Sequence, residues 1–488
     1  MVRKSELQRE IEAYLSKGRY PFHMPGHKRT ALFDNGLPYA MDLTELPETD
    51  DLHDASGMLL RAMRRSAELY GAGRTWYLVN GSSCGNLAGI FAMTRPGDEV
   101  VAARNCHRSV YHAAQLRNLK VHWLLPDWEE EFGIFGSVRA EEAERPLRRY
   151  PKSRALILTS PSYEGIVSDI ESIAALCHER GVPLYVDEAH GAHFGLEREG
   201  KSFFPRSAIQ LGADLCVQSV HKTLPSLTQT AWLHWKSKLV SEREVGRRLA
   251  VFESSSPSYP LLLSLDSCTE LLLSRREELF SHWGSCLAAF ERELAGLQNF
   301  SILKGRRGGH FFDRDPGKLL LHCKEREMSG AALSEALRER FSIETEMSLG
   351  RNCLAMTSPL DPEEAYRRLF DAMKTLDREL SLRERNIAPP FLKGRESVFY
   401  GSALPLPESA LSLGEAAERA HRLIPLRSSL GEISGEYLYA YPPGIPVLAP
   451  GERITEELLR WILRETEAGD RLRFSESGEE SGGIFVCQ

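Results

Sequence analysis

Seven short apolar runs between residues 75 and 235 are the feature that most restricts the fold of this chain. Each run is apolar along nearly its whole length, and helix-patterned stretches such as SCGNLAGIFAMT and DIESIAALCHER separate the runs. Strands that are buried on both faces and alternate with helices are typical of a mainly parallel sheet. The sequence therefore predicts a large α/β domain. Its expected strands are 75–80, 98–103, 120–125, 154–160, 182–187, 214–219 and 230–235.

The segments on either side of this pattern predict further domains. Apolar residues at near-helical spacing indicate one amphipathic helix over about residues 1–20, and a long helix is expected over 260–298. Strand-like and helical segments mix between 300 and 378, which favours a smaller α+β unit. We therefore divide the chain into an N-terminal helix with a segment near the active site (1–57), a large domain (58–298), a small α+β domain (299–380) and a C-terminal domain with a mobile tail (381–488).

Composition excludes several classes of protein. The 61 Lys and Arg residues against 68 Asp and Glu give a net charge of −7, without the basic excess that nucleic-acid binding needs. The nine cysteines form an odd, scattered set with no C-x-x-C pair, which fits neither a disulfide framework nor a structural zinc site. The N-terminus lacks the apolar core of a signal peptide, and no stretch is apolar enough to span a membrane. We expect a cytoplasmic enzyme without nucleic-acid or membrane partners.

Two chemically capable side chains follow predicted buried strands. Lys222, in SVHKT, comes directly after the strand 214–219, where desolvation would favour the neutral amine that Schiff-base chemistry requires. Asp187 ends the strand 182–187 and could hold a positive charge on a ligand nitrogen. The carboxyl ends of parallel strands are where such folds bind ligands. A solvated lysine and a helix-capping acid are the alternatives.

Two strand-to-helix junctions carry a second pair of signals. The turn LVNGSSCGN opens a helix after the first strand, and its small residues would let an anion approach the positive helix end. His107, in ARNCHRSVYH, lies at the next junction and could stack on a flat ring. Taken alone, such a turn is more often only a helix cap, and a histidine at a helix start is usually a cap or a surface residue.

The segment that begins at Asp187 has two other interpretations. Asp187, Glu188, His190 and His193 could be metal ligands, but their spacing matches no common zinc pattern, so no metal site is expected. GLEREGKS (195–202) satisfies the P-loop pattern, and DEAH (187–190) spells a helicase-like box. A P-loop should connect a buried strand to a helix, whereas Pro205 follows this one closely. A P-loop ATPase is therefore a distant alternative.

Taken in order, the phosphate turn, the stacking histidine, the aspartate and the lysine resemble the fold-type-I pyridoxal-phosphate enzymes. More narrowly, eight motifs resemble the bacterial ornithine/lysine/arginine decarboxylase family over about residues 20–454. These motifs are HMPGHK, DDLH, NGSSCGN, RNCHRS, DEAHGAH, SVHKTLPSLTQTA, SSSPSYP and YPPGIPVLAPGE. The resemblance implies an α/β fold of the fold-type-I class with a mainly parallel large-domain sheet, a smaller α+β domain and a C-terminal α+β domain.

The resemblance also implies pyridoxal 5'-phosphate as cofactor. Lys222 would bind it covalently as a Schiff base, Asp187 would pair with the pyridine nitrogen and His107 would stack on the ring. These three residues are the expected catalytic set. The serines at 255 and 256 match a stretch that in relatives approaches the cofactor from a partner subunit, which implies a homodimer or a higher homo-oligomer. The expected cofactor-binding residues are Ser83, Cys84, His107, Asp187, Ala189, His190, Ser219, His221, Lys222, Ser255 and Ser256.

Individual members of that set differ in how well they match the family. Ser83, Cys84, Ser219 and His221 would surround the phosphate, but Cys84 stands where relatives often have a hydroxyl residue. Ala189 corresponds to a residue that packs beneath the ring in relatives. The role of the following His190 is open.

The implied reaction is decarboxylation of a basic amino acid, arginine, lysine or ornithine, to the corresponding amine and CO2 in polyamine-related metabolism. The acidic run from Glu48 to Asp54 could meet the distal cation of such a substrate, although a solvated acidic loop is an equal alternative. The candidate substrate-binding residues are His23, His27, Asp50 and Asp51.

Two further alternatives keep the same fold. A pyridoxal-phosphate-dependent aminotransferase would share the core residues and would need an arginine for the substrate carboxylate, for which Arg351 is a candidate. A scaffold that has lost activity is also conceivable, but the joint presence of Lys222, Asp187 and His107 argues against it.

Overall fold

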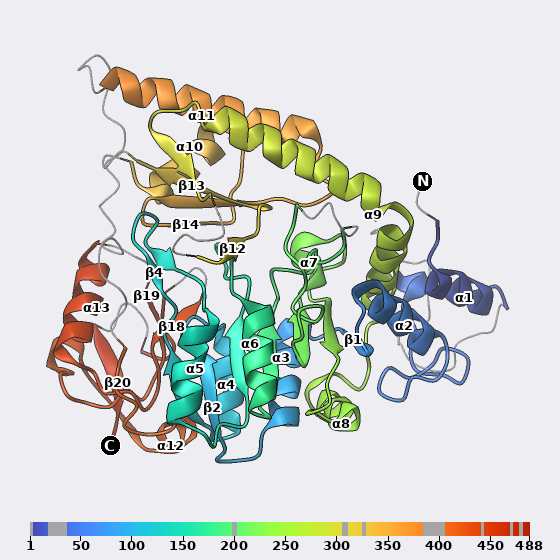
Figure 1. The fold of residues 1–488 in the computed structure, drawn as a ribbon, viewed down its shortest axis with the longest axis horizontal. Coiled ribbons are helices and arrows are strands. Elements are labelled where there is room, and N and C mark those ends of the chain that lie inside the picture. Colours follow the sequence, from blue (N-terminus) through green and yellow to red (C-terminus); the bar gives the residue numbers. More distant parts are fainter. Residues whose placement is uncertain are drawn as a thin grey trace. The chain divides into compact units, whose positions relative to one another are not determined.

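The computed structural model describes most of the chain (Figure 1). The chain forms two compact units, each built from separated stretches. The first unit comprises Met1–Thr94, Arg154–Ser160 and Ile170–Phe280, and the second comprises Arg95–Ser153, Pro161–Asp169 and Ser281–Gln488. The described residues are 3–17, 37–197, 203–304, 311–324, 328–383, 406–440, 444–468, 472–477 and 482–488.

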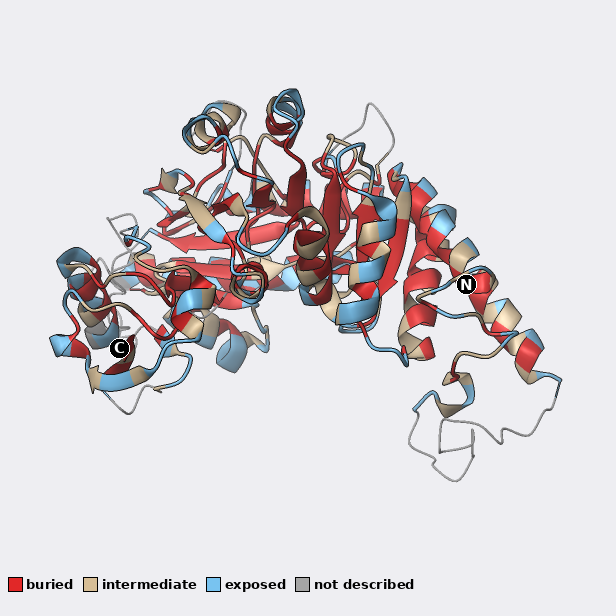
Figure 2. Cartoon of the chain, turned by 90° about the horizontal axis from the view of Figure 1, so that it is seen from below, coloured by how far each residue is buried: buried red, intermediate tan, exposed pale blue. Residues whose placement is uncertain are grey.

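The first unit contains five of the predicted strands, in the spatial order β1-β10-β9-β8-β6. Strand β8 is parallel to both β6 and β9, whereas β10 is antiparallel to β9 and to β1. Almost every residue of these strands is buried, in agreement with their continuous apolar pattern (Figure 2). The bounds are β1 Arg74–Leu78, β6 Leu156–Thr159, β8 Leu184–Asp187, β9 Leu215–Gln218 and β10 Ala231–Trp235.

Helix α3 of this unit packs unusually close to the strands because Gly85 and Gly89, two of its glycines, face them. A Cβ atom at Gly85 would lie 2.5 Å from Val217 Cγ2, and one at Gly89 would overlap the ring of Tyr185. This close packing sets the helix start beside the carboxyl ends of β1 and β9. The helices of the unit are α1 Glu6–Leu15, η1 Tyr39–Met41, α2 Met58–Tyr70, α3 Gly81–Met93, α6 Ile170–Glu179, α7 Val220–Thr223, α8 Glu242–Phe252 and the first part of α9 Tyr259–Leu294.

The amphipathic N-terminal helix is confirmed as α1. Ser5 caps it by accepting a hydrogen bond from the backbone N–H of Gln8, and Leu7 and Ile11 are buried on one face. The helix packs on α2 and α9, since Arg61 of α2 donates to Glu10 at 2.7 Å and the Leu7 N–H donates to Asp266 at 3.1 Å. The long helix expected over 260–298 is confirmed as α9.

The remaining two predicted strands belong to the second unit. Strands β2 (Glu99–Ala103) and β3 (Lys120–Leu124) are parallel, and helix α4 (Arg108–Leu116) connects them. All seven predicted strands are therefore present, and the α/β class is confirmed.

The rest of the second unit is α+β, as predicted. One antiparallel sheet has the strand order β11-β13-β15-β14, and a three-stranded sheet has β17 between β18 and β19. Smaller sheets pair β16 with β20, β4 with β5, and β7 with β12. The strands are β4 Trp128–Glu129, β5 Ile134–Phe135, β7 Ile166–Val167, β11 Phe300–Ile302, β12 Asp313–Arg314, β13 Lys318–Cys323, β14 Met347–Leu349, β15 Asn352–Met356, β16 His421–Pro425, β17 Leu438–Ala440, β18 Ile445–Leu448, β19 Leu472–Phe474 and β20 Gly483–Cys487. The helices are α5 Ala140–Arg149, α10 Gly330–Phe341, α11 Glu363–Arg383, α12 Leu413–Ala417, η2 Leu426–Ser428 and α13 Glu456–Ala468. The consecutive domain boundaries expected from the sequence stay a prediction.

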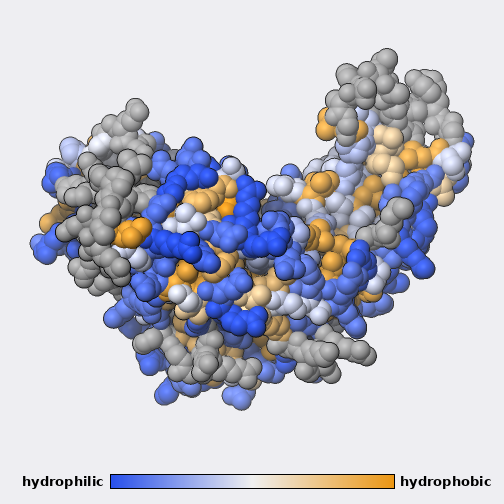
Figure 3. Space-filling view, turned by 90° about the horizontal axis from the view of Figure 1, so that it is seen from above, coloured by the Kyte–Doolittle hydropathy of each residue, from blue (hydrophilic) through white to orange (hydrophobic). Residues whose placement is uncertain are grey.

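On the face of the molecule that Figure 3 shows, hydrophobic residues are interspersed with hydrophilic ones. Of the helices in the described ranges, none combines the length and apolar character needed to cross a bilayer. All nine cysteines lie in these ranges, and each is buried and outside any disulfide.

Candidate active site

Lys222 lies in α7, the single helical turn that follows β9. Its Nζ is 2.8 Å from Nε2 of His190, which belongs to the turn after β8. The backbone N–H of Ser219 donates to the Ala189 carbonyl at 3.2 Å and joins the ends of the two strands. The structure therefore brings together four residues that the sequence predicted for one site.

Asp187 ends β8 with only 2% of its surface exposed. Its Oδ2 accepts a hydrogen bond from Asn86 Nδ2 at 2.8 Å, and its Oδ1 accepts one from the Ala189 N–H at 3.1 Å. Burial raises the pKa of Asp187, while the Asn86 bond, the charge of Lys222 and the Ala189 N–H act in the opposite direction. The carboxylate is held in one orientation by groups that favour its charged form.

Two residues of this site were missed from the sequence, Ser82 and Asn86. Asn86 also accepts a hydrogen bond from the Tyr185 hydroxyl at 2.8 Å, and Ser82 Oγ accepts one from Ser219 Oγ at 2.8 Å. They are four residues apart in α3, and this spacing places two side chains on one helix face. The spacing within NGSSCGN is the signal that could have identified them.

The start of α3 has the features of an anion site. Gly81 adopts a φ of +75°, which glycine takes without strain. Asn80, the residue before the helix, uses its Oδ1 to accept from the Ser254 N–H at 3.1 Å and makes no side-chain cap. The positive end of a 13-residue helix thus lies beside the hydroxyls of Ser82 and Ser219.

The other predicted phosphate residues differ in their surroundings. Ser83 is exposed, whereas Cys84 is 4% exposed and burial raises the pKa of its thiol. His221 is half-buried with Nδ1 2.9 Å from the Thr230 carbonyl, and burial lowers its pKa. The contacts of Ser83, Cys84 and His221 with a phosphate stay predictions.

The serine segment and the acidic loop also reach the turn before α3. Glu253 Oε1 accepts from the Val79 N–H at 2.7 Å, just before the exposed Ser255 and Ser256. His53 Nε2, in the acidic loop, lies 2.9 Å from the Ser254 carbonyl oxygen. Segments far apart in sequence therefore meet at one strand end.

Asp50, one of the predicted substrate residues, organises its own loop. Its carboxylate accepts backbone N–H bonds from Asp51, Ser56, Gly57 and Leu59 at 2.8–3.1 Å. Partial burial opposes ionisation of Asp50, but these donors outweigh it and hold the pKa below its usual value. The Asp50 carboxylate thus binds the backbone N–H groups around the start of α2.

Of the other three predicted substrate-binding residues, the structure describes only Asp51. Asp51 is exposed, and its Oδ1 accepts from the His53 N–H at 2.8 Å. His23 and His27 lie outside the described residues. A substrate role for any of them stays a prediction.

His107, in the second unit, is the N-terminal cap of α4. Its Nδ1 accepts from the Ser109 N–H at 3.2 Å and lies 2.8 Å from Ser109 Oγ. When the ring is neutral, this places its proton on Nε2. The half-buried ring is thereby fixed in orientation, and its stacking on a cofactor stays a prediction.

The residues of the alternative interpretations have other contacts in the structure. The Glu188 carboxylate accepts from Ser207, Ala208, Cys216 and Gln218, and burial raises its pKa to about 7. Among the described residues, no group of three His, Cys, Asp or Glu side chains is arranged to hold a metal. The P-loop-like segment falls partly outside the described residues, and its described part, 195–197, lies in a turn region rather than at a strand end. Arg351 donates to the Lys324 carbonyl at 3.0 Å.

Removing the Asn86 amide is expected to perturb Asp187 directly. In an Asn86→Ala variant, the pKa of Asp187 should rise because its strongest stabilising donor is lost, and turnover should fall roughly tenfold. The acidic limb of the pH-rate profile should move to higher pH. Tyr185→Phe, which removes only a donor to Asn86, should have a smaller effect. Superimposable profiles for wild type and Asn86→Ala would show that the bond does not tune Asp187.

Glu253 should make stability depend on pH. Burial raises its pKa to about 7, so the folded state binds its proton more tightly than the unfolded chain does. Its contribution to stability is full below the unfolded pKa and is lost as pH rises through about 7, a difference of about 3 kcal/mol. Glu253→Gln keeps an acceptor for the Val79 N–H and removes the titration. Calorimetry should show the variant gaining Tm relative to wild type between about pH 5 and pH 8; an unchanged difference would contradict this.

Comparison with known proteins finds matches over most of the chain. The family model described as Orn/Lys/Arg decarboxylase, major domain, matches residues 6–291, and the model for the C-terminal domain of the same family matches residues 403–472. The chain is 31% identical over 472 residues to an arginine decarboxylase of Bacillus subtilis (strain 168), covering 94% of this chain and 93% of the relative. It is 30% identical over 470 residues to an arginine decarboxylase of Halalkalibacterium halodurans, with the same coverage.

A solved structure shows the same fold. The lysine decarboxylase LdcF of Francisella novicida superimposes with a TM-score of 0.83 at 20% identity, covering 99% of this chain and 81% of that one.

Proposed function

Since the chain belongs to the Orn/Lys/Arg decarboxylase family, we propose that it is a pyridoxal-phosphate-dependent enzyme that converts a basic amino acid into its amine and CO2. Arginine is the first substrate to test, because relatives named arginine decarboxylase match at 30–31% identity. Relatives named lysine decarboxylase match at 21–24%. The residues at the carboxyl ends of the strands support the proposed cofactor, as follows.

These residues fit the proposed cofactor. Lys222 offers an amine for the covalent attachment, and Asp187 offers a buried carboxylate for the ring nitrogen. The start of α3, with Ser82 and Ser219, offers a positive helix end and two hydroxyls for the phosphate. When bound, pyridoxal phosphate supplies an electron sink for the electron pair that remains when CO2 leaves. His107 is the candidate for holding the ring from one face.

The protein's own contribution is electrostatic and positional. Asp187, fixed by Asn86 and Ala189, holds a proton at the ring nitrogen without having to reorganise. His190 lies at hydrogen-bond distance from Lys222 Nζ and orients the amine. After CO2 is lost, the substrate carbon needs a proton, and Lys222 or His190 is the candidate donor.

We extend the proposal to assembly and location. The exposed Ser255 and Ser256 are proposed to face the cofactor site of a partner subunit in a homodimer. The nine cysteines form no disulfide, which favours a reducing compartment, so the enzyme is proposed to act in the cytoplasm in polyamine-related metabolism.

The observation that carries the proposal is the meeting of Lys222, His190 and Asp187 at the carboxyl ends of the adjacent parallel strands β8 and β9. The test is to incubate the purified protein with pyridoxal phosphate and with arginine, lysine or ornithine separately. Release of CO2 and amine in equal amounts from one of them is expected. Formation of a keto acid without CO2 would identify an aminotransferase instead, and no reaction with any of the three would overturn the proposal.

A further inference from the structure

The C-terminal part of the second unit contacts the turn that presents His107. Arg104, the first residue after β2, is fully buried, and Glu452 is 2% exposed. Arg104 Nη2 donates to Glu452 Oε2 at 2.9 Å and to the Val447 carbonyl at 3.2 Å. Glu452 Oε2 also accepts from the Ala449 N–H at 2.8 Å. A charged pair thus links residues 348 positions apart in the sequence.

The guanidinium of Arg104 is enclosed by rings as well. It lies 5.7 Å from the ring centroid of Tyr111 and 5.2 Å from that of Trp123, and these two rings stack at 4.4 Å. Burial acts to lower the pKa of Arg104, but the Glu452 carboxylate outweighs it and keeps the arginine charged. A buried charge that loses its partner is strongly destabilised. Glu452 is therefore what allows Arg104 to occupy this position.

Arg104 is connected to His107 through a short, fixed turn. The Tyr111 hydroxyl donates to the Arg104 carbonyl at 2.7 Å, and the Val110 N–H donates to the His107 carbonyl at 2.9 Å. The side chain of Arg104 is held by Glu452, and its backbone is held by α4. A displacement of Arg104 would therefore reach His107, three residues later.

The C-terminal part also holds the far end of α4. Tyr437 donates from its hydroxyl to Gln115 Oε1 at 2.8 Å, and Ser412 Oγ donates to Asn118 Oδ1 at 2.6 Å. A Cβ atom at Gly414 would lie 2.9 Å from the Gln115 carbonyl oxygen, so the chain approaches the helix closely there. Residues between 412 and 452 thus contact both the turn before α4 and the C-terminal end of α4.

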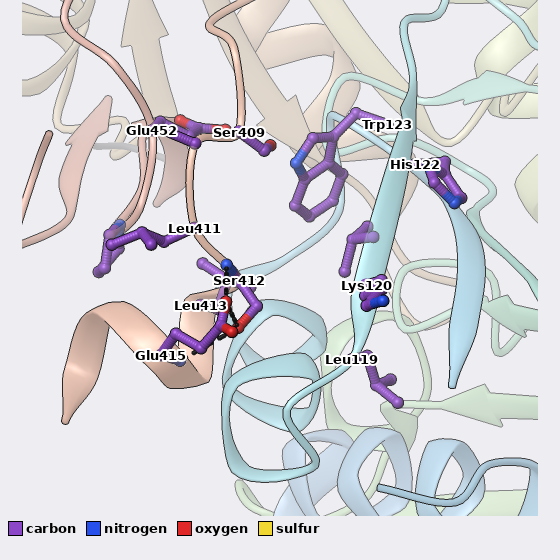
Figure 4. A pocket seen from close by; sticks show the side chains of 13 residues that line it. Leu119, Lys120, His122, Trp123, Ser409, Leu411, Ser412, Leu413, Glu415 and Glu452 are labelled. Atoms are coloured by element: carbon purple, nitrogen blue, oxygen red, sulfur yellow. Dashed lines mark hydrogen bonds between the residues drawn. The ribbon is translucent and has the colours of Figure 1, made fainter. Parts of the chain in front are cut away.

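A cavity of about 290 Å³ separates β3 from the segment 409–415 in the same region. Figure 4 shows Glu452 and Ser409 on one side of it and Trp123 on the other. Glu452, which holds Arg104, therefore lines this cavity.

We propose that Glu452 is a positioning residue, through which the C-terminal part of the chain fixes Arg104 and thereby sets His107 against the cofactor ring. The inference rests on the proposed function, since it assumes that the protein binds pyridoxal phosphate. It assigns to the C-terminal part a role in cofactor binding that acts through Arg104 and His107.

The test is a double-mutant cycle of Glu452→Gln and His107→Ala. The Kd of the cofactor-free protein for pyridoxal phosphate is measured by fluorescence quenching, and the visible circular dichroism of the bound cofactor is recorded. His107→Ala should raise the Kd roughly three- to tenfold, as expected for one lost aromatic contact. Glu452→Gln should raise it and alter the dichroism in the same direction. The double variant should be no weaker than His107→Ala.

The matched control is Glu432→Gln, which makes the same change in an exposed ion pair with Arg422 and should leave the Kd unchanged. If Glu452→Gln yields no folded protein, Tyr437→Phe replaces it in the same cycle with the same expectation. Additive effects, a Kd unaffected by the Glu452 variant, or a Kd unaffected by His107→Ala would overturn the inference. Wild-type protein that binds no pyridoxal phosphate would instead refute the proposed function.

Discussion

Replacing Asp187 with asparagine is expected to lower the turnover of amino-acid decarboxylation roughly 10²–10³-fold, the loss typical of a single preorganised electrostatic group. The carboxylate is buried and receives two hydrogen bonds, so its charge is fixed in direction before any ligand arrives. Asparagine keeps the volume and one acceptor but cannot hold a proton on a ring nitrogen. The measurement is kcat for the active amino acid at saturating cofactor, with unfolding followed separately.

Asp214→Asn is the matched control for this prediction. Asp214 is equally buried but precedes β9, at the opposite strand ends, where it accepts from the Leu184 N–H and lies 2.9 Å from His178 Nε2. Its replacement should lower the stability of the folded protein. The kcat of the folded fraction should stay within about twofold of wild type, because hydrogen bonds at the strand ends opposite the active site do not change between the ground state and the transition state. Equal losses of kcat in both variants would show that Asp187 acts through the fold alone.

Lys222→Ala should have the largest effect, a loss of activity on the order of 10⁴-fold or more, since the variant lacks the attacking amine. It should also fail to retain the cofactor through gel filtration. Lys236→Ala, at an exposed lysine just after β10, should retain wild-type activity and cofactor. Substantial turnover by the Lys222 variant would remove this residue from the mechanism.

The strands could be predicted because a strand that is buried on both faces is apolar along nearly its whole length. The direction of β10 could not be predicted. An apolar run such as TAWLHW fits a parallel or an antiparallel strand equally well, and tertiary contacts decide its pairing. Asp187 and Lys222 could be identified because each lies at or shortly after the carboxyl end of a buried strand.

Other parts of the site depend on geometry that no local pattern records. Asp50 reads as a solvated acid, yet its φ of +72° lets it collect four backbone N–H groups. The contact between Arg104 and Glu452 joins residues that nothing in the sequence connects. Asn86 lay within a motif already noted, and only its helical spacing from Ser82 distinguishes it.

Reduction of the cofactor-loaded protein with borohydride, followed by peptide mapping, tests the central claim most directly. Reduction makes a Schiff base between the cofactor and a lysine permanent, so the modified residue can be read from the mass of its peptide. The account predicts a single phosphopyridoxyl group on the peptide that contains Lys222. A modification at another lysine, or none after incubation with pyridoxal phosphate, would contradict it.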